Sequence, residues 1–198
     1  MTDAMEEQID RLSELANIGA GHAAGAFSLL TGHTIRMAVP RVRLTSALTA
    51  NEPALDEPLE FVSLATADRG WESGVIFEFD GCLHAILAIL FRRPMCDAVV
   101  RNLTGQSEGF LPPETIESAL MELGNVLASH VASAIADTLG ARLLPSIPML
   151  SVHGAIPQLE ALAATRPGAG QVWIESELLD GDGILGGLVV MIPDRETA

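Results

Sequence analysis

Two short polar patterns in the sequence could do chemistry, and they match each other. Each pattern places a carboxylate and a carboxamide three residues apart, Glu14 with Asn17 and Glu122 with Asn125. On a helix, residues three or four apart lie on one face, so each pair would project from one side. Such groups act through hydrogen bonds and charge, and no serine lies in a recognisable nucleophile setting. The patterns therefore mark one face of each helix as a candidate site.

The match between the two patterns extends well beyond these pairs. A polar residue precedes each glutamate by four positions, and a proline follows each asparagine by twenty-three. These flanking residues are Asp10 and Pro40 in the first copy and Ser118 and Pro148 in the second. Apolar and small residues between them recur at the same interval of 108 positions: Leu12, Leu15, Ala20, His22, Ala24, Ala26 and Gly32 return as Leu120, Leu123, Ala128, His130, Ala132, Ala134 and Gly140.

This repeat predicts one domain, residues 1–198, built from two related halves of about 5–105 and 113–194. Each half is small for an independent hydrophobic core, and a solenoid would need at least three repeats of a much shorter period. We therefore expect internal pseudo-twofold symmetry, with each half carrying one copy of the polar site.

A structural interpretation of the polar pattern stays open at this point. The carboxylates could form a solvated helix face, and each asparagine could hydrogen-bond to the segment that follows. Each proline could simply set the edge of a strand. Duplication preserves packing residues as well as functional ones. Asparagine is nevertheless a mediocre residue for a helix interior, and its recurrence in both halves favours a functional role.

The elements that position these residues follow from periodicity and turn signals. Helical spacing of apolar residues covers 6–30 and 116–139, and a glycine follows each segment. Strand and turn signals predict extended segments within 34–44 and 142–152 and two hairpins. The first hairpin joins strands 74–79 and 83–91 around Asp80-Gly81, and the second joins strands 172–179 and 184–192 around 180–183. Shorter helices are predicted near 94–103 and 157–164, and loops at 52–60 and 165–170. The segment 61–68 has no counterpart and is not placed. The predicted fold class is α/β, with a mainly antiparallel sheet and the two long helices on one face.

Composition excludes several classes of partner. The formal net charge of −15 disfavours nucleic acid and anionic membrane surfaces, because Lys and Arg supply most of the affinity for both. No signal peptide is visible at the start of the chain, and the longest apolar stretch, 82–91, is too short to span a bilayer. Cys82 and Cys96 have no metal-ligand spacing, and two cysteines in a chain of this size suggest a reducing cytoplasm.

The five histidines do not predict a metal site, because no two of them lie three or four residues apart. His22 and His130 are equivalent in the repeat. We therefore predict that both are buried and hydrogen-bonded near the pseudo-twofold axis, and that the chain needs no metal or cofactor of its own.

The same residues resemble the CheC family of chemotaxis phosphatases, the group of CheC, CheX and FliY. The resemblance rests on ELANIGAGHAA at 14–24, on ELGN at 122–125 and on the two downstream prolines. The family signature is Asp or Ser, three residues, Glu, two residues, Asn, and Pro after a gap of 22. Both halves satisfy it, and only the region from about 46 to 70 fits poorly.

The resemblance implies a phosphatase that hydrolyses the aspartyl phosphate of a CheY-type response regulator. The receiver already holds a divalent metal and a lysine, so the missing element is a water in line for attack. A neutral carboxamide orients water without repelling the phosphoryl oxygens, which makes Asn17 and Asn125 the expected catalytic residues. In the family the glutamates, here Glu14 and Glu122, are taken to pair with the receiver's lysine.

The remaining expectations concern the rim of the site and the alternative function. Asp10 and Ser118 lie one turn away and are expected to contact the partner. The alternative is a binding module, either a partner of the deamidase CheD or a flagellar-switch component. A pure scaffold has no chemical need for both intact Glu and Asn pairs, which favours the enzyme. A switch component of the FliY type would carry a C-terminal extension, whereas this sequence stops at Ala198.

Overall fold

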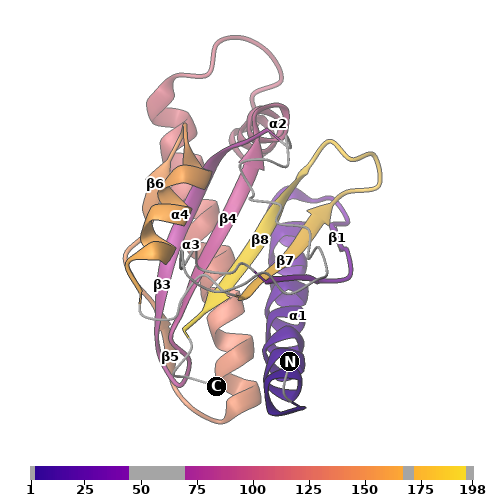
Figure 1. Ribbon diagram of the computed structural model, residues 1–198. Coiled ribbons are helices and arrows are strands. Elements are labelled where there is room, and N and C mark those ends of the chain that lie inside the picture. Colours follow the sequence, from indigo (N-terminus) through magenta and orange to yellow (C-terminus); the bar gives the residue numbers. More distant parts are fainter. Residues whose placement is uncertain (1–2, 45–69, 167–171, 195–198) are drawn as a thin grey trace, which may run out of the picture.

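The computed structural model describes residues 3–44, 70–166 and 172–194, and within these ranges the strands form one eight-stranded antiparallel sheet (Figure 1). The strand order is β1-β7-β8-β4-β3-β5, with β2 also paired to β7 and β6 also paired to β3. The strands are β1 (Arg36–Met37), β2 (Arg41–Leu44), β3 (Trp71–Gly81), β4 (Ala85–Arg92), β5 (Leu143–Pro145), β6 (Met149–Ser151), β7 (Val172–Leu179) and β8 (Gly186–Pro193). The helices are α1 (Asp3–Thr31), α2 (Arg93–Thr104), α3 (Pro113–Leu139) and α4 (Ala155–Ala164).

The two long helices, α1 and α3, pack against each other on one face of the sheet (Figure 1). Strand residues alternate between the faces, so Val75, Phe77 and Phe79 of β3 join the helix-side core. The intervening Ile76 belongs to a second cluster on the opposite face, together with residues of α4. The predicted fold class is therefore confirmed: one mixed α/β domain with a mainly antiparallel sheet and both long helices on one face.

The helix α4 is also held to the sheet by ionic contacts. Arg166, just after its end, pairs with Glu78 on β3 and with Asp194 beyond β8, the latter at 2.8 Å. Burial opposes the charged form of Arg166, but these two carboxylates outweigh it and raise the pKa of the guanidinium. This charge cluster contains none of the predicted site residues and ties the end of α4 to β3 and to the segment after β8.

Two helical glycines permit the close approach of the long helices to their neighbours. A Cβ on Gly19 would lie 2.8 Å from Val131 Cγ1 on α3, and a Cβ on Gly124 would lie 2.9 Å from Val75 Cβ on β3. Both distances are shorter than carbon–carbon contact allows. These glycines therefore set the α1–α3 and α3–sheet distances, whereas Gly21 has open space around it.

The contrast between the glycines gives a stability prediction. Gly124→Ala is expected to lower the free energy of unfolding by about 1–2 kcal/mol, because overpacking against Val75 exceeds the gain in helix propensity. Gly21→Ala gains the propensity term alone and is expected to raise stability by up to about 1 kcal/mol. Thermal melts of both variants beside the wild type measure the difference. Equal melting temperatures for the two variants would contradict the packing argument.

Strand pairing follows the same scheme in both parts of the chain. β2 pairs with β7 so that Arg41 faces Glu175, and β6 pairs with β3 so that Met149 faces Ile76. Met149 follows Arg41 by the repeat interval of 108. Each segment after a long helix therefore pairs with a hairpin strand from the other part of the chain, an arrangement compatible with the predicted repeat.

The predicted elements agree with the structure, apart from the turns of the two hairpins. In β7–β8 the last ladder pair is Leu179 with Gly186, so the turn is longer than 180–183. In β3–β4 the last ladder pair is Phe79 with Ala85, so the turn is longer than Asp80-Gly81. Gly81 instead pairs with Leu143 of β5, and a Cβ there would lie against the carbonyl oxygen of Arg142. Its glycine is explained by this close approach of two backbones and by its φ of +132°. The loop predicted at 52–60, the unplaced segment 61–68 and residues 167–170 of the second predicted loop lie outside the described residues.

Helix α3 is long and apolar enough, by length and composition alone, to cross a membrane. However, 56% of its apolar window is buried inside the protein, including Leu120, Leu123 and Leu127 against the sheet. This burial identifies α3 as the central core helix of the domain.

Candidate functional site

Both Glu–Asn pairs lie on exposed helix faces. Glu14 and Asn17 project from α1, and Glu122 and Asn125 project from α3. Asp10 and Ser118, one turn earlier, are exposed as well. Within the described parts of the chain, none of the four Glu and Asn side chains makes a hydrogen bond or ion pair. The catalytic role predicts that Glu14, Asn17, Glu122 and Asn125 are solvent-accessible on one surface; all four are exposed, and in the described structure neither asparagine is used to satisfy a backbone group.

The helical period explains why the pairs face solvent while their neighbours are buried. Leu12, Ala16 and Ala20 are at most 7% exposed and form the stripe that faces the core. Residues of this stripe recur every four positions, whereas Glu14 lies on the opposite face and Asn17 lies on the flank of the helix, about 100° from Ala16. The same alternation places Leu120 and Leu123 inside and Glu122 outside on α3.

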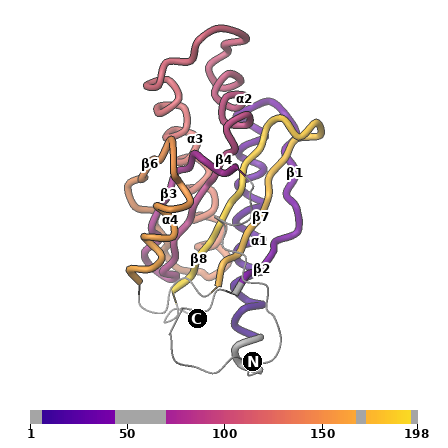
Figure 2. Tube along the Cα trace, turned by 45° about the horizontal axis from the view of Figure 1, so that its top comes forward, coloured from indigo at the N-terminus to yellow at the C-terminus, as the bar shows by residue number. Residues whose placement is uncertain are grey.

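After α1 the chain turns back and runs along the helix as β1, which brings Pro40, the first motif proline, level with Asn17. Ser28 Oγ accepts a hydrogen bond from the backbone N–H of Ile35 at 2.9 Å, which clamps the returning chain to the helix. Asn17 lies three turns before Ser28, on the same side of α1 and about 16 Å along its axis. Five extended residues beyond Ile35 cover a similar distance and end at Pro40. Figure 2 shows this returning segment, from β1 to β2, running along the edge of the domain.

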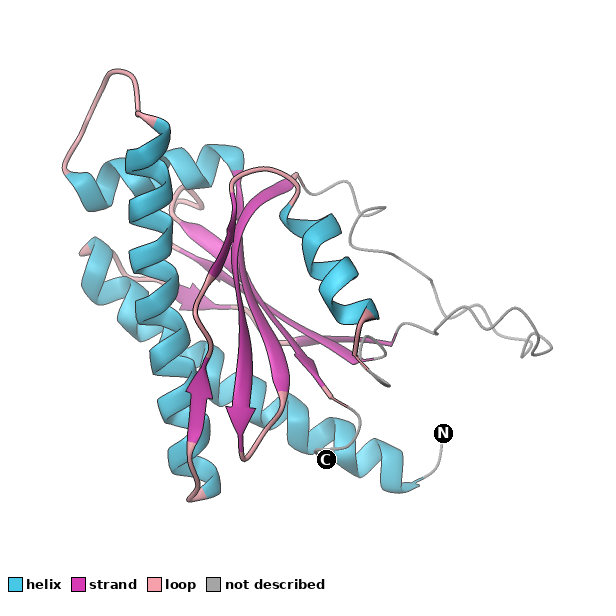
Figure 3. Ribbon diagram, turned by 90° about the vertical axis from the view of Figure 1, so that its left-hand side faces the viewer, coloured by secondary structure: helices cyan, strands magenta, loops and turns pink. Residues whose placement is uncertain are grey.

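The second motif proline returns along α3 in the same way. From the end of α3 at Leu139, the chain turns at Gly140 and runs back through β5. After this turn, five extended residues beyond Leu143 reach Pro148 about 16 Å back along the helix, which is within about one turn of the level of Asn125, roughly 21 Å before the helix end. Figure 3 shows the segment between β5 and β6 lying beside α3.

The two proline loops, residues 38–40 and 146–148, are each held by a backbone hydrogen bond to a strand of the sheet. The N–H of Ala38 donates to the carbonyl oxygen of Glu177 at 2.8 Å, and the N–H of Ser146 donates to that of Glu78 at 2.8 Å. Ala38 and Ser146 both precede their proline by two residues. Each loop is therefore fixed to the edge of a strand, on the flank of one long helix.

By helix geometry the two Glu–Asn pairs face different sides of the packed α1–α3 helices. Gly19 of α1 faces Val131 of α3, and Asn17, two positions away, points about 160° around the helix. On α3, Asn125 points about 120° away from Val131 by the same geometry. Both asparagines therefore lie on the outer flanks of the helix pair, each beside its own proline loop.

The prediction that His22 and His130 are buried is wrong. Both are exposed on their helices. The buried positions next to His22 are Ala20, Ala23 and Ala24, and residue 22 falls outside that stripe. Recurrence of a residue type in the repeat does not distinguish a packed position from a surface position, which is the reason for the error.

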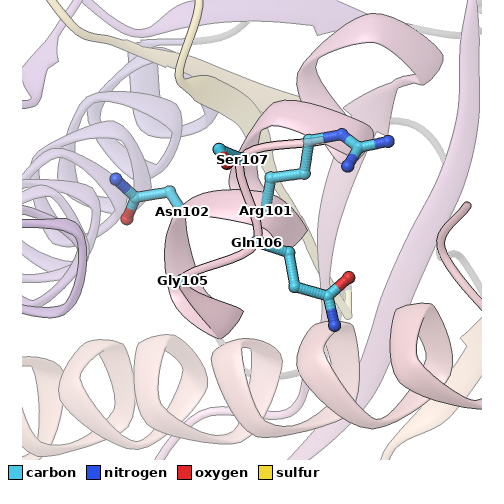
Figure 4. Close-up of a pocket in the computed structure, with 5 residues that line it drawn as sticks. All are labelled: Arg101, Asn102, Gly105, Gln106 and Ser107. Atoms are coloured by element: carbon cyan, nitrogen blue, oxygen red, sulfur yellow. The ribbon is translucent and has the colours of Figure 1, made fainter. Parts of the chain in front are cut away.

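A shallow hollow lies at the end of α2. It is lined by Arg101, Asn102, Gly105, Gln106 and Ser107 (Figure 4). Arg101 donates to the carbonyl oxygen of Gly109 at 2.7 Å and so closes the α2–α3 connection. None of the predicted site residues lines this hollow.

Of the two free cysteines, Cys82 is half-buried and Cys96 is buried. Cys96 on α2 is 3% exposed, and burial raises the pKa of its thiol to about 11. A neutral, enclosed thiol is neither a nucleophile nor a metal ligand at neutral pH.

Solved structures define the class of protein that this fold represents. FliY from Thermotoga maritima superimposes with a TM-score of 0.64 at 15% sequence identity, covering 100% of this chain and 93% of that chain. The CheX-CheY-BeF3-Mg2+ complex from Borrelia burgdorferi gives a TM-score of 0.58 at 14% identity, covering 91% of this chain and 97% of the matched chain. At these identities the likeness establishes the fold, which is that of the CheC, CheX and FliY chemotaxis proteins.

Sequence comparison relates the chain to the CheC-like proteins within this group. The model of the CheC-like family matches residues 7–43, the stretch that contains Glu14, Asn17 and Pro40. The CheY-P phosphatase CheC of Bacillus subtilis (strain 168) is 29% identical over 181 residues, which cover 88% of this chain and 81% of that protein. The resemblance to the CheC family indicated by the sequence is thereby confirmed.

Proposed function

We propose that this protein hydrolyses the aspartyl phosphate of a CheY-type response regulator in the cytoplasm, with one catalytic centre in each half. The proposal rests mainly on the exposure of the Glu–Asn pairs and on their lack of hydrogen-bond or ionic partners among the described residues. All four side chains are exposed and without partners in the described structure, and each pair lies on one helix face beside a motif proline. Side chains with a packing role would instead be buried or hydrogen-bonded.

The comparisons support the choice of substrate. The Bacillus subtilis relative is a CheY-P phosphatase, and the Borrelia burgdorferi CheX structure contains CheY with BeF3 and Mg2+. In this reaction the receiver domain itself holds the phosphoryl group on its aspartate. The phosphatase therefore needs no enclosed pocket, and an exposed helix face can reach the phosphoryl group. The two outer flanks of the helix pair are such faces.

In this proposal each side chain has a defined role. Glu14 or Glu122 pairs with the lysine of the receiver's site and thereby fixes the orientation of the helix. Asn17 or Asn125 then hydrogen-bonds a water in line with the phosphorus. The water oxygen attacks phosphorus, the bond to the receiver's aspartate breaks, and inorganic phosphate and a free carboxylate result. Positioning of this kind accounts for most of the catalysis in phosphoryl transfer.

Timed loss of phosphate from candidate receivers tests the proposal. Each purified receiver is phosphorylated by a small-molecule phosphodonor with Mg2+, the donor is removed, and a substoichiometric amount of the protein is added. We expect at least about a tenfold faster loss for the cognate receiver, with multiple turnovers. A receiver panel that is bound but never dephosphorylated faster than alone would instead support a binding module, such as a CheD partner or a flagellar-switch component.

A further inference from the structure

Two large aliphatic side chains project into solvent directly before the two motif prolines. Val39 is 84% exposed and Ile147 is 86% exposed. A single exposed aliphatic residue is ordinary on a protein surface. Among the exposed large hydrophobics of the described ranges, however, these two alone are separated by the repeat interval of 108. Because neither has a packing role that duplication would preserve, their recurrence points to a role on the surface.

The backbone holds both side chains in place. Ala38 and Ser146, the residues before them, donate the matched 2.8 Å hydrogen bonds to Glu177 and Glu78. The prolines that follow restrict residues 39 and 147 to extended conformations. Valine and isoleucine are also stiff at χ1. A partner that buries these side chains therefore has little conformational entropy to overcome, which favours binding.

Val39 and Ile147 lie next to the proposed catalytic asparagines. The prolines are level with Asn17 and, within about one turn, with Asn125, so a receiver that brings its phosphoryl group to either asparagine also covers the neighbouring loop. Long-range charge does not favour this encounter, because the chain carries a formal charge of −15 and the phosphoryl group is anionic. Apolar contact is a source of affinity that this repulsion does not weaken.

We infer that Val39 and Ile147 are the apolar docking residues of the two centres, each packing against an apolar side chain at the rim of the receiver's phosphorylation site. The inference rests on the proposed function. Neither residue touches a reacting atom, so each stabilises the bound receiver equally before and during the reaction. Such uniform binding affects KM and leaves kcat unchanged.

The test compares V39S/I147S with the wild type by initial rates over a range of phosphorylated receiver concentrations. Serine removes the apolar contact without adding charge, and positions this exposed tolerate it without loss of folding. We expect KM to rise about tenfold or more with kcat within about twofold. V39A/I147A, which keeps one methyl group at each position, should give a smaller rise. The matched control is L29S, because Leu29 is 85% exposed on α1 but has no apolar counterpart in the second half.

The outcomes separate this inference from the proposed function. An unchanged KM in V39S/I147S, with an active wild type, would overturn the docking role and leave the phosphatase intact. An equal rise in L29S would show a general effect of surface hydrophobicity and would also overturn it. A wild type that accelerates phosphate loss from no receiver would overturn both.

Discussion

Replacing both asparagines by alanine is expected to abolish nearly all acceleration of phosphate loss. If each carboxamide positions the attacking water, its removal costs a transition-state contact of about 3 kcal/mol, or roughly a hundredfold in rate at that centre. Because the sites lie on opposite flanks of the helix pair, N17A and N125A should each keep part of the wild-type rate. Single-turnover kinetics with saturating protein measure this directly.

The fold should survive these substitutions, since both asparagines are exposed and without partners in the described structure. Melting temperature and affinity for the receiver should therefore stay close to the wild-type values. H22A is the matched control, because His22 is exposed on the same helix as Asn17 but well around its axis. A double variant N17A/N125A with the wild-type rate on every receiver would refute the water-positioning role.

Reversing the charge of the glutamates is expected to remove binding sites for the receiver. In E14K a cation meets the receiver's lysine, so repulsion replaces attraction at the first centre. Calorimetry with a beryllofluoride-activated receiver should give two sites for the wild type, one site for E14K or E122K, and no measurable binding for the double variant. Single variants should keep about half of the wild-type rate at saturating receiver.

The control for this charge reversal is E117K. Glu117 is exposed on α3, but it lies around the helix from Glu122, and the substitution changes the net charge of the chain by the same amount. It should retain both sites. Loss of binding in E117K to the same extent would mean that net charge, rather than pairing at the two sites, governs association.

Much of this architecture could be predicted because its signals are local. The apolar period of α1 and α3, the glycines that end them and the alternating strands around short turns each lie within one segment. The Glu–Asn pairs were recognised because their spacing recurs 108 residues later in the sequence, and their exposure follows from the phase of the helical stripe.

What could not be predicted depends on contacts between distant segments. The pairing of β2 with β7 and of β6 with β3 joins residues more than seventy positions apart, and no pattern in either strand specifies its partner. The sequence predicts that Gly81 is a turn glycine, whereas in the structure it pairs with β5 and its backbone lies close to that of Arg142. Val39 and Ile147 look like ordinary strand residues in the sequence, because only the fold shows that they are exposed.

The most direct test of the central claim is a structure of this protein bound to a beryllofluoride-activated CheY-type receiver. We expect the carboxamide of Asn17, or of Asn125, beside the beryllofluoride with a water held in line, and Glu14 or Glu122 paired with the receiver's lysine. A receiver docked elsewhere, for example on the α4 face of the sheet, with both asparagines still in open solvent, would contradict it.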